Sequence, residues 1–220
     1  MPVPKKSRIL VVDDHPMVRE WLAQMINRET DLTVCGEAAD AASTLTMIES
    51  LKPEMAIVDL TMKDSHGTEL VREIATHFPS LPVLVLSMHD ESLYAERAMR
   101  AGAKGYIAKQ EAGDKIRSAI RSVLNGQIYL SEAVASRIIR SAVGDPSSSI
   151  PSSVDSLSEQ QLTVMRMIGR GLTTNQIADQ LQLSVKTVEG YIARIKKKLN
   201  LANATELLQY AILFNKTSGD

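Results

Sequence analysis

The chain is poor in cysteine and in long apolar runs, and each absence narrows the classes of protein to which it can belong. Cys35 is the single cysteine among 220 residues, so no disulfide can form within the chain. This fits a reducing compartment and predicts a cytoplasmic protein, with Cys35 a small core residue of a strand near residues 32–35. No segment approaches the roughly 18 apolar residues of a membrane span. The four apolar residues after Arg8 are too few for the core of a signal peptide.

Charge and length predict a globular protein of one or two domains. The sequence has 25 Lys and Arg against 26 Asp and Glu, and 44% of its residues are hydrophobic. Residues 144–153 are rich in Gly, Pro and Ser, and beyond them the charge changes sign, since residues 155–220 hold eight basic and six acidic side chains. We therefore expect a domain at residues 7–127, a helix and flexible linker at residues 128–156, and a small domain at residues 157–216.

In the first part, apolar runs typical of buried strands are followed directly by polar residues. The runs and their following residues are 9–12 with Asp13 and Asp14, 55–58 with Asp59, 82–86 with Ser87, and 105–108 with Lys109. Apolar residues at helical spacing separate the runs. Together with the strand near residues 32–35, this predicts an α/β domain with a doubly wound, five-stranded parallel sheet. The carboxyl ends of parallel strands line one edge, so three carboxylates, a hydroxyl and an ammonium group should meet there.

These side chains suit the Mg²⁺-assisted transfer of a phosphoryl group to a carboxylate. Packed carboxylates repel one another unless a cation lies among them, and Mg²⁺ prefers oxygen ligands. The candidate ligands are Asp13, Asp14, Asp59 and the backbone carbonyl of Thr61. Asp59 would accept the phosphoryl group as a nucleophile. Lys109 would then neutralise the phosphoryl oxygens, and Ser87 would donate a hydrogen bond to one of them.

Residues 8–125 resemble the receiver domain of two-component response regulators. The resemblance rests on Ile-Leu-Val-Val-Asp-Asp-His-Pro at 9–16, Val-Asp-Leu-Thr-Met at 58–62, Val-Leu-Ser at 85–87 and Gly-Tyr-Ile-Ala-Lys at 105–109. It implies a flavodoxin-like fold, phosphorylation of Asp59 by a sensor histidine kinase, and a switch in which Tyr106 responds to Ser87. Receiver domains usually have proline four residues after the phosphorylated aspartate. Here Lys63 stands there, which leaves the loop freer.

Two other interpretations of the acidic residues stay open. The aspartates could be solvated strand ends, or the chain could be a phosphatase with an aspartate nucleophile. That phosphatase family has a second Asp two residues after the nucleophile, where this sequence has Thr61. The four histidines are scattered along the sequence, and we expect them on loops or the surface rather than in a metal site. They are His15, His66, His77 and His89.

Four short helices are predicted in residues 157–216 from their capping residues. These are Ser158, Thr173, Ser184 and Asn203. The first, second and fourth are followed three residues later by Gln or Glu, as in a capping box. A tight turn at residues 182–183 joins the second helix to a third that carries a basic stripe. Helix, tight turn and basic helix are typical of the helix-turn-helix motif, whose second helix enters the major groove of DNA.

Residues 157–214 resemble the LuxR-type DNA-binding domain. The matching segments are Leu157-Ser158, Gly171-Leu172-Thr173, Gln176-Ile177-Ala178, Leu183-Ser184, Thr187-Val188 and Lys198-Leu199. A receiver followed by this domain is similar to the NarL/FixJ subfamily of response regulators. By position, the resemblance implies DNA contacts at Lys186, Thr187, Glu189, Gly190, Ala193, Arg194, Lys196 and Lys197. Glu189, Gly190 and Ala193 would approach base edges, whereas the basic residues, with Lys198, would contact phosphates.

The third helix departs from the family after Thr187-Val188. The family often continues Lys-x-His, whereas this chain continues Glu189-Gly190-Tyr191. Gly190 either permits a close approach to DNA or is a tolerated exposed glycine, and it costs the helix about 1 kcal/mol relative to alanine. The base preference of the family therefore does not carry over, and a solvated basic face remains the alternative to a DNA-binding one.

The last helix is predicted to have a core face and an association face. Ala204, Leu207, Leu208, Ala211 and Ile212 follow helical spacing and should face the core of the small domain. Tyr210, Leu213 and Phe214 are left outside this stripe. The resemblance implies that this helix pairs two DNA-binding domains across a twofold axis, with Tyr210 and Leu213 near the axis.

Together these features predict a phosphorylation-controlled transcription regulator and not an enzyme. Its expected partners are a sensor histidine kinase, double-stranded DNA with inverted-repeat half-sites, RNA polymerase, and a second copy of the chain once phosphorylated. The alternative is a phosphorelay or protein-interaction switch whose C-terminal domain does not bind DNA specifically. The Glu189-Gly190-Tyr191 departure is the reason for keeping it.

Overall fold

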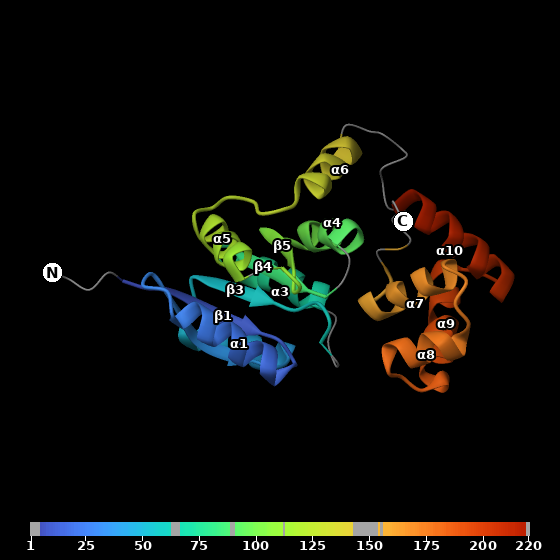
Figure 1. Cartoon of the computed structure of the whole chain (residues 1–220), viewed down its shortest axis with the longest axis horizontal. Coiled ribbons are helices and arrows are strands. Elements are labelled where there is room, and N and C mark those ends of the chain that lie inside the picture. The colour runs from blue at the N-terminus through green and yellow to red at the C-terminus, as the bar shows by residue number, and fades with distance from the viewer. Residues whose placement is uncertain are drawn as a thin grey trace. The chain divides into compact units, whose positions relative to one another are not determined.

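The computed structural model describes residues 5–62, 67–88, 91–111, 113–142, 154 and 156–218. The chain forms two compact units, residues 1–135 and residues 136–220 (Figure 1). Three residues discussed above, Lys63, His66 and His89, lie outside the described residues, as does the stretch 144–153. No helix in the described part of the chain is long and apolar enough to cross a membrane.

The first unit is built on a five-stranded parallel sheet with the order β2-β1-β3-β4-β5. The strands are β1 (Ser7–Val12), β2 (Leu32–Ala38), β3 (Met55–Val58), β4 (Val83–Ser87) and β5 (Gly105–Ala108). The helices between and after them are α1 (Pro16–Asn27), α2 (Ala41–Leu51), α3 (Gly67–His77), α4 (Glu91–Ala101) and α5 (Gly113–Leu124). The α/β prediction is thereby confirmed.

Helices cover both faces of this sheet, which explains why its central strands are continuous apolar runs rather than alternating ones. Helices α1 and α5 pack against one face, where Ile9, Val11 and Ile57 contact Leu22 of α1 and Ile120 of α5 in one buried cluster. The side chains of the opposite face, such as Leu10 and Val58, are buried too, as are Ile48 of α2, Leu70 of α3 and Ala95 of α4. Strand β2 is at the edge of the sheet, and Cys35 within it is only half-buried, so the expectation of a core cysteine is wrong.

The chain after α5 returns to the edge strand β5 before it enters α6 (Glu132–Ala142). The amide of Tyr106 donates to the carbonyl of Tyr129 at 2.9 Å, and the amide of Tyr129 donates to the carbonyl of Lys104 at 3.0 Å. Gly105 makes this approach possible, because a Cβ there would lie 3.1 Å from both Cβ and the carbonyl oxygen of Tyr129. The amide of Ser131 then donates to Oε1 of Glu91 at 2.9 Å. The first residues after α5 are therefore packed on the first unit.

Beyond the end of α6, the second unit contains α7 (Glu159–Gly169), α8 (Thr174–Leu181), α9 (Val185–Leu199) and α10 (Ala204–Ser218). The four predicted helices are confirmed, and so are their capping residues. Ser158 and Thr173 form capping boxes with Gln161 and Gln176, and Ser184 accepts a hydrogen bond from the amide of Thr187. Gln182, in the left-handed conformation, makes the tight turn between α8 and α9.

The core face of α10 differs from the prediction. Leu207, Ala211 and Phe214 are buried, whereas Leu208 and Ile212 are 39% and 38% exposed, and Ala204 is exposed as well. Helix α10 packs along α7, where a Cβ on Gly169 would lie 2.5 Å from the carbonyl oxygen of Ala211. This close approach fixes the rotation of α10, so Phe214 belongs to the core and the other flank faces solvent.

Candidate functional site

The register of the sheet brings the predicted chemical residues to one edge. Val12 pairs with Val58, so Asp13 and Asp59 leave neighbouring strands side by side, and the amide of Asp59 donates to the carbonyl of Val12 at 2.9 Å. On the other side, Ser87 pairs with Ala108, and the amide of the next residue, Lys109, donates to the carbonyl of Ser87 at 2.8 Å. The strand ends therefore fix the backbone from which each functional side chain projects.

The ammonium group of Lys109 joins two buried carboxylates. Its Nζ lies 2.6 Å from Oδ2 of Asp13 and 2.8 Å from Oδ2 of Asp59, and both aspartates are 1% exposed. Oδ1 of Asp59 is also buried, but it has no hydrogen-bond partner among the described residues. A buried oxygen without a partner is costly. Oδ1 of Asp59 is therefore the atom at which a cation or a phosphoryl group would be stabilising.

The electrostatics of the site leave an excess of negative charge. Burial raises the pKa of Asp59, Lys109 lowers it in part, and neighbouring Asp13 raises it again, so the pKa is above the usual range. Burial would lower the pKa of Lys109, but attraction to Asp59 and Asp13 outweighs this and raises it. Lys109 therefore remains an ammonium group, which is one positive charge against the carboxylates of Asp13, Asp14 and Asp59. That donor set fits a hard divalent cation such as Mg²⁺.

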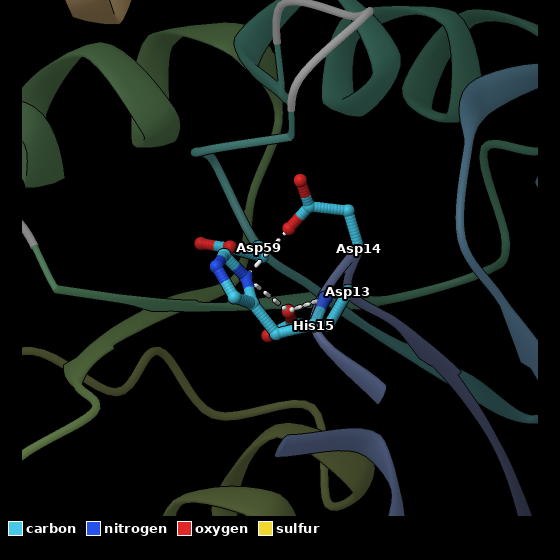
Figure 2. A group of neighbouring side chains, drawn as sticks. All are labelled: Asp13, Asp14, His15 and Asp59. Carbon is cyan, nitrogen blue, oxygen red and sulfur yellow. Dashed lines mark hydrogen bonds and ion pairs between the residues drawn. The ribbon is translucent and has the colours of Figure 1, made fainter. Parts of the chain in front are cut away.

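His15, which directly follows Asp13 and Asp14 in the sequence, has its ring at this site. Figure 2 shows its ring beside the carboxylates, with Nδ1 2.6 Å from Oδ1 of Asp14 and 3.3 Å from Oδ1 of Asp13. Its backbone amide also donates to Oδ1 of Asp13 at 2.9 Å. The ligand atoms of Asp13, Asp14, His15 and Asp59 lie within 4.8 Å of one another. The side chain is 57% exposed, so the predicted surface placement of His15 is confirmed.

Gly67, at the start of α3, supports the acceptor segment and was missed from the sequence. A Cβ at this position would lie 2.3 Å from Cα of Leu60 and 2.7 Å from the carbonyl oxygen of Asp59. The first turn of α3 therefore packs directly on the backbone that holds Asp59. Nothing in the spacing of the sequence distinguishes this glycine from others near a helix start.

The side chains of Ser87 and Tyr106 are both fully buried beside the site. Burial raises the pKa of the Tyr106 hydroxyl, and a hydrogen bond from Ser87 offsets only part of this effect. The ring of Tyr106 is thus buried inside the first unit, and its hydroxyl is hydrogen-bonded to the hydroxyl of Ser87.

In the second unit, α9 presents the predicted basic face to solvent. Its exposed residues include Lys186, Thr187, Glu189, Ala193, Arg194 and Lys197, while Gly190 and Lys196 are half-buried. Lys198 differs from these, because its Nζ donates to the carbonyl of Ser156 at 2.6 Å and so helps to hold α9 to the start of the unit. On α10, Leu213 is 65% exposed and Tyr210 is half-buried.

Both units match known families. Residues 9–121 match the family described as "Response regulator receiver domain", and residues 155–211 match "Bacterial regulatory proteins, luxR family". The "Oxygen regulatory protein NreC" of Staphylococcus carnosus (strain TM300) is 32% identical over 93% of this chain and 96% of its own length.

Solved structures agree with these matches. A two-component response regulator of the LuxR family from Aurantimonas sp. SI85-9A1 is 33% identical, with a TM-score of 0.58 over 63% of this chain and 99% of that chain. The RcsB protein of Salmonella enterica serovar Typhimurium, bound to the promoter rprA in the presence of the phosphomimetic BeF₃⁻, is 25% identical. Its TM-score is 0.57 over 94% of this chain and 99% of that chain.

Proposed function

Because this chain belongs to the two-component response regulators that join a receiver domain to a LuxR-type DNA-binding domain, we propose that Asp59 is its phosphoacceptor and that phosphorylation controls how α9 binds DNA. This family regulates transcription and is not a family of enzymes. The observation that supports the proposal most is the state of Asp59, a buried carboxylate with Oδ2 held by Lys109 and Oδ1 without a partner among the described residues.

The two oxygens of Asp59 have different roles in the proposed reaction. Oδ1 attacks phosphorus, and the bond between phosphorus and the donor's imidazole nitrogen breaks, with the electron pair remaining on that nitrogen. Lys109 keeps Oδ2 in place and then neutralises a phosphoryl oxygen, and the Ser87 hydroxyl donates to another. Asp13, Asp14, Asp59 and the carbonyl of Thr61 would hold Mg²⁺, which when bound neutralises charge on the phosphoryl oxygens.

Phosphorylation of Asp59 would also affect residues beyond the site, through Ser87 and Tyr106. The new charge competes for the hydroxyl of Ser87, which at present is bonded to buried Tyr106. Tyr106 in turn donates its amide to Tyr129 at the start of the segment that leads to the second unit. The new charge on Asp59 can thus act, through Ser87 and Tyr106, on the segment that leads into α6, the helix whose residues are divided between the two units.

The proposed partners follow from the same sites. A sensor histidine kinase supplies the phosphoryl group, and double-stranded DNA with inverted-repeat half-sites binds two phosphorylated copies through α9. RNA polymerase is the further partner of a regulator that acts at promoters. RcsB, a relative of similar architecture, is bound to a promoter in the presence of a phosphomimetic, which supports this assignment.

Labelled acetyl phosphate tests the acceptor. Wild-type protein should incorporate label with Mg²⁺ and lose incorporation with EDTA, whereas Asp59→Asn should incorporate none under either condition. Asp114→Asn is the matched control, because Asp114 is an exposed carboxylate of the same unit that pairs with Arg117. Equal labelling of wild type and Asp59→Asn would reject Asp59 as the acceptor.

The second candidate function is a protein-interaction switch without specific DNA binding. Exposed Glu189 is the observation in its favour, because a carboxylate on the face of α9 repels phosphates. Selection of bound fragments from a genomic DNA library by the phosphorylated protein separates the two functions. Enrichment of a shared motif supports regulation through DNA, and enrichment of none supports the interaction switch.

A further inference from the structure

Gly190 is not required by the packing of its own domain. Among the described residues, a Cβ at Gly190 would meet only Nη2 of Arg194, at 3.9 Å, which is an ordinary contact. Glycine within a helix weakens it relative to alanine, and no close contact with the described residues of the second unit compensates for this at residue 190. The close approach of a base edge to the space above the helix would account for glycine here, and the head of Arg194 lies at the edge of that space.

The ring of Tyr191 packs beside the guanidinium group of Arg194. The Tyr191 hydroxyl donates to Oε1 of Gln160 on α7 at 3.0 Å, so the ring is anchored to a neighbouring helix as well as to α9. The guanidinium carbon of Arg194 lies 5.6 Å from the centroid of this ring, within the range of a cation–π interaction. Gln160, Tyr191 and Arg194 thus form a connected series that fixes a long side chain which would otherwise be mobile in solvent.

The head of Arg194 is held on the face of α9 that should meet DNA. Thr187, Gly190, Arg194 and Lys197 are spaced three or four residues apart and so share one face of the helix. Side chains on a helix project toward its N-terminus, which places the head of Arg194 over Gly190. In a helix-turn-helix motif the N-terminal part of the second helix contacts base edges, and Gly190 lies within the first two turns of α9. The head of Arg194 therefore reaches that part of the helix, although its own backbone lies one turn further along. The usual contact of an arginine with a base in the major groove is a bidentate hydrogen bond to O6 and N7 of guanine.

We propose that Arg194 is a base-reading residue, that it recognises a guanine in the major groove, and that Tyr191 and Gly190 position it. Tyr191 orients the guanidinium plane, and the absence of a side chain at residue 190 leaves room for that plane and a base edge together. The sequence alone placed Arg194 among the phosphate contacts, and this inference replaces that role. It rests on the proposed binding of DNA by α9.

Full-length protein phosphorylated with acetyl phosphate, a duplex selected from random sequences, and a non-specific duplex provide the test. Arg194→Lys keeps the charge but removes the fork of donors. We expect it to lose about 5- to 150-fold in affinity for the selected duplex, with unchanged affinity for the non-specific duplex and an unchanged salt dependence. In the selected duplex, 7-deazaguanine at the recognised position should weaken wild type and leave Arg194→Lys almost unaffected. Tyr191→Phe, which keeps the ring and loses the bond to Gln160, should show a smaller loss of the same kind.

Lys197→Gln is the control for a phosphate contact on the same face. It should lower affinity for both duplexes and reduce the slope of log affinity against log salt by about one. If Arg194→Lys binds the selected duplex as tightly as wild type, or if 7-deazaguanine has no effect on wild type at any guanine, Arg194 is not a base-reading residue. If wild type binds no duplex at all, the proposed DNA-binding function fails, and this inference fails with it.

Discussion

Asp59 is a functional residue whose role could be predicted from the sequence, and other residues of the same site could not be predicted in this way. The functional residues at the strand ends could be predicted from the sequence. An apolar run followed by Asp, Ser or Lys indicates both a buried strand and the polar residue at its carboxyl end. Gly67 and His15 could not be predicted in their roles, since these depend on how closely a helix start approaches Leu60 and on which way an exposed ring turns. The sequence therefore predicts the functional residues at the strand ends, but it does not predict the contacts that loop residues and glycines make.

Arg121 allows a prediction about stability and pH at the same scale. Its Nε and Nη2 donate to both carboxylate oxygens of Asp31 at 2.8 and 2.9 Å, and Nη2 also donates to Glu29. The hydrogen bonds from Arg121 to Asp31 are the largest cause that lowers the pKa of Asp31, to about 2. A carboxylate whose pKa is lowered by folding stabilises the protein above its unfolded pKa, and that contribution is lost as the pH falls through the folded pKa.

Arg121→Gln should therefore lower the free energy of unfolding near pH 7 by up to about 1 kcal/mol, a small value because the pair is largely exposed. The difference from wild type should shrink as the pH falls from about 4 toward 2. Urea unfolding followed by the fluorescence of Trp21, the single tryptophan of the chain, measures it. Lys115→Gln is the control and should change little, because Lys115 is on the same helix as Arg121 and makes an exposed pair with Glu111, which precedes that helix. A difference that grows in acid would contradict this account of Asp31.

At the scale of elements, sequence predicts where helices begin more reliably than how they are rotated. Ser158, Thr173 and Ser184 marked helix starts correctly, because a cap is a local arrangement of side chain and backbone. The rotation of α10 was predicted wrongly, because apolar residues occur on more than one of its faces. The core face is chosen by the contact of α10 with Gly169 of α7, which is distant in sequence.

The same substitution at two glycines tests this view of the helices. Gly169→Ala should destabilise the second unit by about 1–3 kcal/mol, because its Cβ would lie 2.5 Å from the carbonyl oxygen of Ala211, a backbone atom that cannot move alone. Gly190→Ala should stabilise α9 by up to about 1 kcal/mol, because it adds a better helix former where there is space. Hydrogen exchange of α7 and α9 in the full-length protein measures both changes. Equal effects of the two substitutions would show that local helix propensity, and not the contact between α7 and α10, decides stability here.

At the scale of the whole molecule, two flanks of α10 compete as association surfaces. Leu213 lies on the flank that includes Tyr210, whereas Leu208 and Ile212 lie on the opposite side of the buried stripe formed by Leu207, Ala211 and Phe214. Consecutive residues of a helix are about 100° apart, so Leu213 and Ile212 face different directions although they are neighbours in sequence. Each flank offers few apolar groups, so pairing should be weak in solution and should form mainly on DNA, where two copies are brought together.

We expect phosphorylated full-length protein to bind a duplex with two inverted half-sites cooperatively, and Leu213→Lys to abolish the cooperativity while leaving binding to a single half-site intact. The introduced ammonium groups would face each other across the twofold axis, because a symmetric interface repeats every residue on both copies. Ile212→Lys is the matched control, since it introduces the same charge at another exposed aliphatic residue one position away, and it should retain the cooperativity. Titration of one-site and two-site duplexes measures both variants. Loss of cooperativity in Ile212→Lys alone would move the contact to the Leu208 flank, and binding of a single copy to the two-site duplex at every concentration would reject the dimer.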